Sequence, residues 1–378
     1  SEVTTLYQEN SLVASYRLDG NSNDDMRTYN GTDNDITYEF GLNFTPDFVW
    51  IKNRTSANDH GLYDSSRGAT KYISPNTTGA EGTYSTVLTS FDTGGFTFGS
   101  NPGGNNDGDD YVAWCLKANG GTTSSNTDGT ITSTVQANQD AGFSIVSYTG
   151  SGSAGSVGHG ISAGAPDLVI IKRLDGTTYW QVWYNGAGTS PASGINRLYL
   201  NDTQGNDSST TNVFYPDATK INLNSGDHFF NTSSGNYIAY CFKSVDSFSK
   251  IGTYTGNGSA NGPIVETGFE PAFLMIKNTS STESGGASWL MYDNKRSQSN
   301  PRDRRLFADQ NYAEAQNDNY DLDFLSNGFQ IKSGTSNYGY NNNGDRYLYM
   351  AFAADPDTEA PTLASSFSTV AYTGTGTN

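Results

Sequence analysis

Two short phrases recur three times along this chain of 378 residues, and the duplication limits what the chain can fold into. The first phrase is PDFVWIK with its variants, at residues 46–52, 166–172 and 271–277. The second is YVAWCLK with its variants, at residues 111–117, 237–243 and 347–353. Such duplication repeats a folding unit, and a single catalytic site is seldom built that way. We therefore expect three copies of one unit in a binding or structural protein.

The repeats predict where the chain divides. A third phrase, FSIVSYTG with its variants, opens the second and third repeats and returns at residues 367–374. We therefore expect the natural polypeptide to be longer than this sequence. The predicted units are a lead-in strand and turn at 1–35, a first repeat at 36–121, a connector with a second repeat at 122–246, a third repeat at 247–356, and a linker with the start of a further repeat at 357–378.

Composition favours strands over helices. Hydrophobic residues make up 34% of the chain and aromatic residues 13%, while Gly, Ser, Thr and Asn are abundant. Aromatic and β-branched residues suit a pleated sheet, and Gly and Asn suit turns. The first phrase also carries at least four apolar residues in a row, which is typical of a strand buried on both faces. We predict an all-β fold of tandem antiparallel β-sandwich repeats, jelly-roll or lectin-like, arranged in a row.

The charge of the chain restricts its partners. The formal net charge is -18, so nucleic acid and anionic membrane surfaces are disfavoured as partners because both would repel this protein. No stretch approaches the roughly 18 consecutive apolar residues that a membrane span needs. Cys115 and Cys241 occupy matching positions in successive repeats, so we expect small buried side chains and no disulfide between them.

A patch in the middle of each repeat contains the candidate ligand-binding residues. An Asp-x-x-Arg pair could hold a sugar hydroxyl while an aromatic ring stacks on the sugar face. The alternative is that each pair only ties a strand end to its turn. The candidate residues are Tyr63, Asp64, Arg67, Trp183, Tyr292, Asp293 and Arg296.

Two acidic, Asn-rich loops are candidate metal sites, and Ca²⁺ is the ion they would suit, since closely spaced carboxylate and amide oxygens are its preferred ligands. Neither loop has the full calcium-loop pattern with its closing Glu, and the alternative is a solvated turn. The candidate ligands are Asp19, Asn21 and Asn23 in one loop and Asp107 and Asp109 in the other. We predict no other cofactor.

No catalytic residue stands out in the sequence. The chain has no Gly-x-Ser-x-Gly elbow and no zinc-binding His motif. Lys52, Lys172 and Lys277 end the first phrase in each repeat, and we expect them to extend from a sheet rim into solvent. A glycosidase needs only two carboxylates, so a hydrolase stays among the alternatives.

The repeated phrases resemble a known group of proteins. Residues 44–54, 60–68, 110–117, 128–135 and 142–150 are similar to repeat-bearing, tail-fibre-like virion structural proteins of marine tailed phages, particularly phages of cyanobacteria. The likeness covers about residues 36–356. Residues 12–31 are separately similar to the first strand of concanavalin-like lectin domains.

The resemblance implies a location on the virion exterior, either tail fibre or capsid surface. We expect a non-enzymatic virion structural protein that contacts other virion proteins and attaches to a host-surface glycan. Fibres assemble symmetrically, so we expect a homo-oligomer, with a trimer as the first expectation. The alternatives are a capsid decoration or head-fibre protein with a purely structural role, and a polysaccharide depolymerase.

Overall fold

The computed structural model describes Leu42 and residues 44–188, 195–209, 211–280, 287–316, 320–332, 339–353 and 366–376. The regular structure of these residues is β-strand apart from α1 (Pro102–Asn105). All strand pairs in the sheets are antiparallel, which confirms the predicted all-β, sandwich-type class. The lead-in at 1–35 and its lectin-like strand lie outside the described residues.

Each repeat is built on one main sheet with the same central order of four strands. In the first repeat these strands are β2 (Gly61–Asp64), β1 (Phe48–Asn53), β7 (Asp110–Leu116) and β28 (Phe367–Thr373). In the second they are β13 (Gln181–Tyr184), β12 (Leu168–Arg173), β18 (Asn236–Phe242) and β10 (Phe143–Thr149). In the third they are β22 (Leu290–Asp293), β21 (Pro271–Asn278), β27 (Arg346–Ala353) and β19 (Ser249–Thr255).

Further strands extend two of these sheets. In the second repeat the additions are β14 (Ile195–Tyr199) and β15 (Asp207–Ser209) at one edge, and β9 (Ser133–Asn138) and β8 (Ser124–Asn126) at the other. In the third repeat β23 (Arg304–Phe307) and β24 (Ala315–Gln316) continue beyond β22. The first repeat has the separate pair β3 (Lys71–Tyr72) and β4 (Gly82–Thr83).

A smaller second layer covers the outer face of each main sheet. It consists of β5 (Leu88–Asp92) and β6 (Gly95–Phe98) in the first repeat. In the second it consists of β11 (Gly155–Gly158), β16 (Phe214–Pro216) and β17 (Lys220–Leu223). In the third it consists of β20 (Ile264–Glu266), β25 (Leu322–Leu325) and β26 (Gly328–Ile331). Each repeat is therefore a two-layer sandwich, as its doubly buried strands predict.

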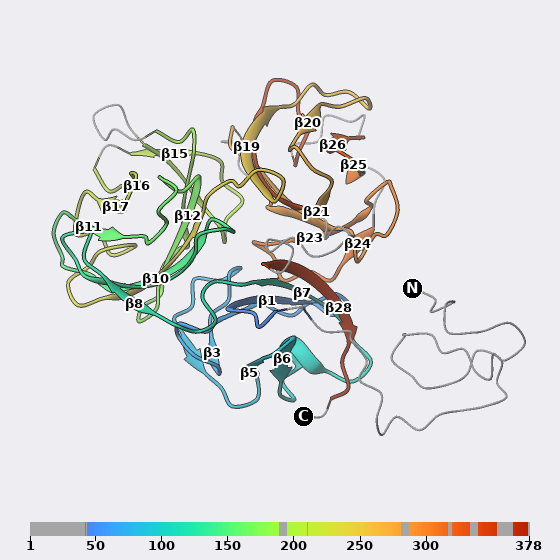
Figure 1. Cartoon of the computed structure of the whole chain (residues 1–378). Helices are drawn as coiled ribbons and strands as arrows, with labels where there is room; N and C mark the ends of the chain where they lie inside the picture. Colours follow the sequence, from blue (N-terminus) through green and yellow to red (C-terminus); the bar gives the residue numbers. More distant parts are fainter. Residues whose placement is uncertain are drawn as a thin grey trace, which may run out of the picture.

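The inner faces of the three main sheets share one apolar core. Successive residues of a strand point to opposite faces. In β1, Phe48 and Trp50 therefore face the shared core, whereas Val49 and Ile51 face the outer layer of their own repeat. Figure 1 shows the three lobes gathered around a common centre. The repeats thus form a closed ring and not the expected row, because each has an apolar inner face that it cannot cover alone.

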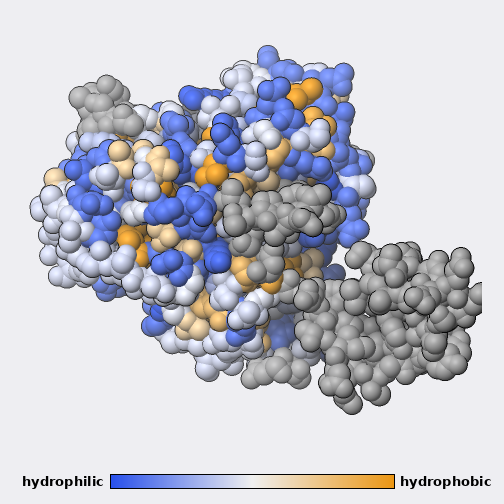
Figure 2. Space-filling model, viewed as in Figure 1, coloured by the Kyte–Doolittle hydropathy of each residue, from blue (hydrophilic) through white to orange (hydrophobic). Residues whose placement is uncertain are grey.

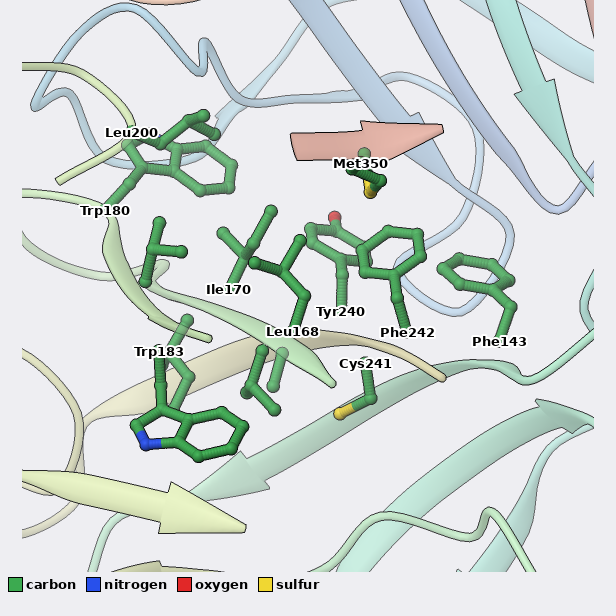
Figure 3. Close-up of a cluster of buried hydrophobic side chains, with 14 of the residues drawn as sticks. Phe143, Leu168, Ile170, Trp180, Trp183, Leu200, Tyr240, Cys241, Phe242 and Met350 are labelled. Carbon is green, nitrogen blue, oxygen red and sulfur yellow. The ribbon is translucent and has the colours of Figure 1, made fainter. Parts of the chain in front are cut away.

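The centre of the ring is enclosed and apolar. A cavity of about 30 Å³ lies there, lined by residues of all three repeats, including Trp114, Tyr240 and Met350. Figure 3 shows Tyr240 and Phe242 on the side of the sheet that faces Met350, while Trp183 and Cys241 lie on the opposite side. Cys115 and Cys241 are both buried and free, as their matching positions predict.

The strand β28 has a different place from the one that the sequence suggests. We expected residues 357–378 to begin a further repeat, yet β28 pairs with β7 along its whole length and completes the sheet of the first repeat. Its Tyr372 stacks on Tyr111, with ring centroids 5.2 Å apart and an interplanar angle of 16°. The second and third repeats contain the same stack at 5.2 Å and 5.0 Å. The edge of β7 pairs with β28 in the same register in which β18 pairs with β10 and β27 pairs with β19, so β28 fits there.

Candidate binding site

The aromatic residues predicted to stack on a sugar are buried. Tyr63, Trp183 and Tyr292 are at most 3% exposed, because the outer layer of each sandwich covers the face on which they lie. The Nε1 of Trp183 donates a hydrogen bond to the carbonyl oxygen of Gly188 at 2.8 Å. Trp183 and Tyr292 therefore form core and have no free face to offer a sugar, and Tyr63, also in the core, reaches the surface only where it lines a groove on the first repeat. The expectation of a stacking platform here is corrected.

The two Asp-x-x-Arg pairs are also internal. Arg67 Nε lies 2.5 Å from Asp64 Oδ2, and Arg296 Nε lies 2.6 Å from Asp293 Oδ2. Each aspartate also accepts the backbone N–H of its arginine, at 2.8 Å and 2.9 Å. This is the geometry of the alternative interpretation, in which the pair ties a strand end to its turn. Their burial leaves no access for a ligand hydroxyl, so the ligand-binding role is corrected.

The same aspartates join neighbouring repeats, which the sequence did not predict. We call the contact surface between two repeats a seam. The Tyr240 hydroxyl of the second repeat donates to Asp64 of the first at 2.7 Å. Trp114 Nε1 of the first repeat donates to Asp293 of the third at 3.2 Å. Since Trp114 and Tyr240 share one position of the second phrase, the two seams use equivalent bonds.

The mid-repeat patch comprises residues 60–67, 180–184 and 289–296, aligned from their first residues. A second set of equivalent bonds is made by the residues at its first position, His60, Trp180 and Trp289. Trp180 Nε1 donates to the Ser74 carbonyl at 3.0 Å, and Trp289 Nε1 donates to the Tyr199 carbonyl at 2.9 Å. His60 Nε2 lies 3.0 Å from the Phe307 carbonyl oxygen, while its Nδ1 accepts from Trp50 Nε1 at 2.8 Å. These partners assign a neutral His60 with its proton on Nε2. Burial holds the pKa of His60 well below its usual value.

The three repeated lysines are buried and do not extend into solvent, which corrects the expectation for them. Lys172 Nζ donates to the carbonyls of Thr78 and Thr178 at 2.9 Å and 2.8 Å. Lys277 Nζ donates to those of Asp202 and Ala287 at 3.0 Å and 2.6 Å. Burial lowers the pKa of Lys52, Lys172 and Lys277 to about 8. At Lys172 and Lys277, one backbone carbonyl of the neighbouring repeat and one of the lysine's own repeat take the place that solvent was expected to take. Lys52 Nζ donates to the Asn53 carbonyl of its own repeat at 2.6 Å.

The loop around Asp107 and Asp109 makes its own internal contacts. Asp109 Oδ2 accepts from Asn53 Nδ2 at 2.8 Å and from Asn106 Nδ2 at 3.1 Å. The bond from Asn53 is the main cause of the lowered pKa of Asp109. No group of three His, Cys, Asp or Glu residues that could hold a metal ion occurs in the described part of the chain. Asp19, Asn21 and Asn23 lie outside it.

An open groove on the first repeat gathers the chemistry that the predicted residues lack. It has a volume of about 330 Å³, near the lower end of the roughly 300–1,000 Å³ of small-ligand sites. Its lining includes the rings of Tyr72 and Tyr84, which meet edge to face with centroids 6.0 Å apart. Tyr84 is 52% exposed, so its ring is accessible to a ligand. The sequence signal for this site was only a tyrosine in a polar turn.

Polar groups surround these two rings. The Tyr72 hydroxyl donates to the His60 carbonyl at 3.2 Å, and burial raises the pKa of Tyr72 to about 12. Asp59 Oδ1 accepts from Asn76 Nδ2 at 2.8 Å, and the rest of this exposed carboxylate lies at the groove. Asn58 Nδ2 donates to the Pro102 carbonyl at 3.2 Å. An aromatic face beside a carboxylate and amides can hold a polar molecule that also has an apolar face.

One residue of the groove distinguishes the first repeat from the others. Gly61 lines the groove, and its counterparts in the mid-repeat patch are Gln181 and Leu290. Both of those side chains are buried, at 0% and 1% exposure, whereas at Gly61 the Tyr63 ring takes the place of a side chain. A Cβ at Gly61 would lie 2.8 Å from the Tyr63 hydroxyl, so even alanine would crowd the floor.

The described chain is thus an all-β protein of three two-layer sandwiches closed into a ring. A family model for a domain of unknown function (DUF7483) matches residues 21–356, so the chain belongs to that family. The match runs through all three repeats. No curated protein and no solved structure was found that matches the chain. Within the described residues, no helix is long and apolar enough to cross a membrane.

Proposed function

We propose that this protein is a non-enzymatic component of a virion exterior, tail-fibre-like, which attaches to a host-surface glycan through the groove on its first repeat. The observation that carries the proposal is the exposed Tyr84 ring beside Tyr72, Asp59 and Asn58 in an open groove. A sugar has an apolar face that stacks on an aromatic ring and hydroxyls that bond to amides and carboxylates. The virion location rests on the resemblance of the repeated phrases.

The groove supports weak binding that many copies strengthen. Each hydrogen bond contributes about 0.5–1.5 kcal/mol net and an aromatic contact a similar amount, so a small site of this kind gives affinities on the order of 1 mM. Copies in a homo-oligomer, with a trimer as the first expectation, raise the effective concentration of further sites. The face in Figure 2 is mostly hydrophilic. With a formal net charge of -18, the chain suits a neutral polar ligand better than an anionic one.

The groove also bears on the depolymerase alternative. Glycoside hydrolysis ordinarily uses two carboxylates that flank the scissile bond. Asp59 is the one acidic residue among those that line the groove. Release of reducing ends from host capsule or lipopolysaccharide by the purified chain would support the depolymerase and contradict the non-enzymatic proposal.

Glycan binding by the purified chain tests the proposal directly. We expect host-surface polysaccharide to bind, and Tyr84→Ala to weaken binding by about threefold to tenfold through loss of the aromatic contact. The matched control is Tyr312→Ala, since Tyr312 is similarly exposed at 58% and does not line the groove. Equal binding by wild type and Tyr84→Ala, or no binding at all, would contradict the proposal.

A purely structural role on the capsid is the second candidate, favoured by the buried polar bonds that hold the three repeats in one ring. Cryo-electron microscopy of intact particles distinguishes the two. Density for this chain on the tail supports attachment, and density on the head supports decoration.

A further inference from the structure

We call the strand that carries the phrase FSIVSYTG, or a variant of it, the opening strand of its main sheet. The first repeat takes this strand from a different place in the chain than the other two repeats do. In the second and third repeats, β10 and β19 precede the strands β18 and β27 with which they pair. In the first repeat, the strand at this position is β28, which follows the entire third repeat. The registers are nevertheless equivalent, since Tyr148 faces Tyr237, Tyr254 faces Tyr347 and Tyr372 faces Tyr111.

The first repeat recognises β28 through the contacts that the other repeats make with their own strands. The Tyr372 hydroxyl donates to the Gly104 carbonyl at 2.8 Å. The matching bonds are from Tyr148 to the Phe230 carbonyl and from Tyr254 to the Tyr340 carbonyl, both at 2.6 Å. The tyrosine of the opening phrase is therefore a specific anchor in each repeat.

The glycine that follows the strand is a second element of recognition. A Cβ at Gly374 would lie 2.2 Å from the Asn106 carbonyl oxygen, a separation that two such atoms cannot adopt. The same approach, 2.3 Å, occurs at Gly150 and Gly256 in the other repeats. Beyond the glycine, Asn105 Oδ1 accepts the backbone N–H of Thr375 at 2.8 Å. Only a strand with glycine at this position fits the edge of β7.

The site needs an occupant because β28 covers the shared core. Phe367 stacks on Phe352 with centroids 4.5 Å apart and lines the central cavity. Without β28, the apolar ring of Phe352 and the N–H and C=O groups of the β7 edge would be open to solvent. A bare strand edge of this kind pairs readily with another chain.

We propose that the β7 edge of the first repeat is an acceptor site for an extended strand, and that β28 of a second copy of this chain supplies that strand when copies assemble. The residues of the acceptor, 104–116 and Phe352, and of the donor, 366–376, are separate sets, so every contact described above is the same whether one chain or two provide them. Pairing within one chain differs only by its higher effective concentration, which crowding of copies on a particle offsets. Because donor and acceptor are different surfaces, the contact joins copies head to tail.

Cysteine cross-linking between two tagged copies tests the exchange. Asp110 and Thr373 are exposed and pair in register, with the Thr373 hydroxyl 2.8 Å from Asp110 Oδ1. One full-length copy carries Asp110→Cys, the other carries Thr373→Cys, and the two are unfolded, mixed and refolded together at high concentration. We expect a disulfide-linked heterodimer. Its absence, while each copy refolds alone, would overturn the proposal.

The matched control adds Gly374→Ala to the Thr373→Cys copy. Since a Cβ cannot be accommodated beside Asn106, the yield of heterodimer should fall at least about tenfold, as expected for the loss of a specific fit. An equal yield would mean that the cross-link reports random collision, and that result would also overturn the proposal.

A peptide experiment keeps the test independent of refolding. The full chain carries Asp110→Cys and Gly374→Ala, so that its own strand is weakened at the acceptor. We expect a peptide of residues 366–376 with Thr373→Cys, and equally a peptide of residues 142–152 with Thr149→Cys, to cross-link at least about tenfold faster than versions with the strand's glycine changed to alanine. Equal rates for glycine and alanine peptides would contradict specific strand acceptance.

Discussion

The seam between the first and third repeats and the seam between the second and third repeats differ at aligned positions. In the first of these, Trp114 donates to Asp293, which is paired with Arg296. In the other, the aligned positions hold Met350 and Tyr184, and Tyr184 donates to Asn206 of its own repeat at 2.9 Å. At these aligned positions, the ring thus has a buried ion pair at one seam and a tyrosine at the other.

This difference bears on how much a substitution at each seam lowers the free energy of unfolding. A buried ion pair adds little net stability, because removing both charges from water offsets their attraction. Losing one partner, however, leaves the other charge buried and unpaired. We call the seam between the first and third repeats the polar seam. Single substitutions there should lower the free energy of unfolding more than substitutions at the seam between the second and third repeats, although both seams close the same core.

Asp293→Ala should have the largest effect. It leaves the fully buried Arg296 guanidinium without its closest carboxylate, and we expect a loss of about 3–5 kcal/mol in the free energy of unfolding. Denaturant titration followed by tryptophan fluorescence measures this. The double variant Asp293→Leu with Arg296→Met should recover most of the loss, and a double variant as unstable as the single one would contradict this account.

Acid should weaken the polar seam through Glu314. Burial alone would raise the pKa of this residue, but hydrogen bonds and charge interactions with Arg54, Arg296 and Arg304 lower it to about 2. A carboxyl with a lowered folded-state pKa contributes stability above its unfolded pKa of 4.5, and this stability is lost as pH falls toward 2. We expect a loss of about 3 kcal/mol over this interval, measured by denaturant titration.

Glu314→Gln provides the comparison for that pH dependence. The variant should be less stable at pH 7 and should lose correspondingly less between pH 4.5 and pH 2. If wild type and Glu314→Gln give parallel stability curves over that range, the carboxylate does not hold this seam.

Alkali should act on the lysines, which all three repeats contain. Their folded-state pKa of about 8 lies below the unfolded value of 10.5. Between these values the unfolded chain binds more protons, so stability rises with pH, by about 1.4 kcal/mol per pH unit for each lysine. Lys277→Met should lower the slope between pH 8 and pH 9.5 by about that amount, and an unchanged slope would show that Lys277 is not buried as a neutral amine.

Tyr184→Phe should have the smallest effect and complete the comparison. It removes one hydrogen bond, to Asn206, at the aligned position of the seam between the second and third repeats, and we expect a loss of about 0.5–1.5 kcal/mol. Thermal unfolding measures the change. A loss as large as that of Asp293→Ala would mean that the two seams are equally dependent on their polar contacts.

The repeated phrases predicted the strands better than the site. Residues 48–53 and 110–116 form the expected doubly buried strands because runs of four or more apolar residues need cover on both faces. Tyr63, Asp64 and Arg67 were expected at a surface, yet they lie in core and seam. Their residue types suit a sugar site and a buried ion pair equally well, and burial is a property of the assembled ring. Tyr84, which lines the groove, carried no repeated signal that could have marked it.

The duplicated apolar phrases alone determined that this chain forms three equivalent two-layer β-sandwiches, because alternation and apolar runs act over a few neighbouring residues. Only the tertiary structure decided that the sandwiches close into a ring and that β28 joins the first of them. It also decided that Lys172, Lys277 and the aspartates of the two Asp-x-x-Arg pairs form hydrogen bonds with neighbouring repeats. Those outcomes depend on contacts between residues far apart in the chain, where burying the three inner faces together outweighs solvation of each face separately.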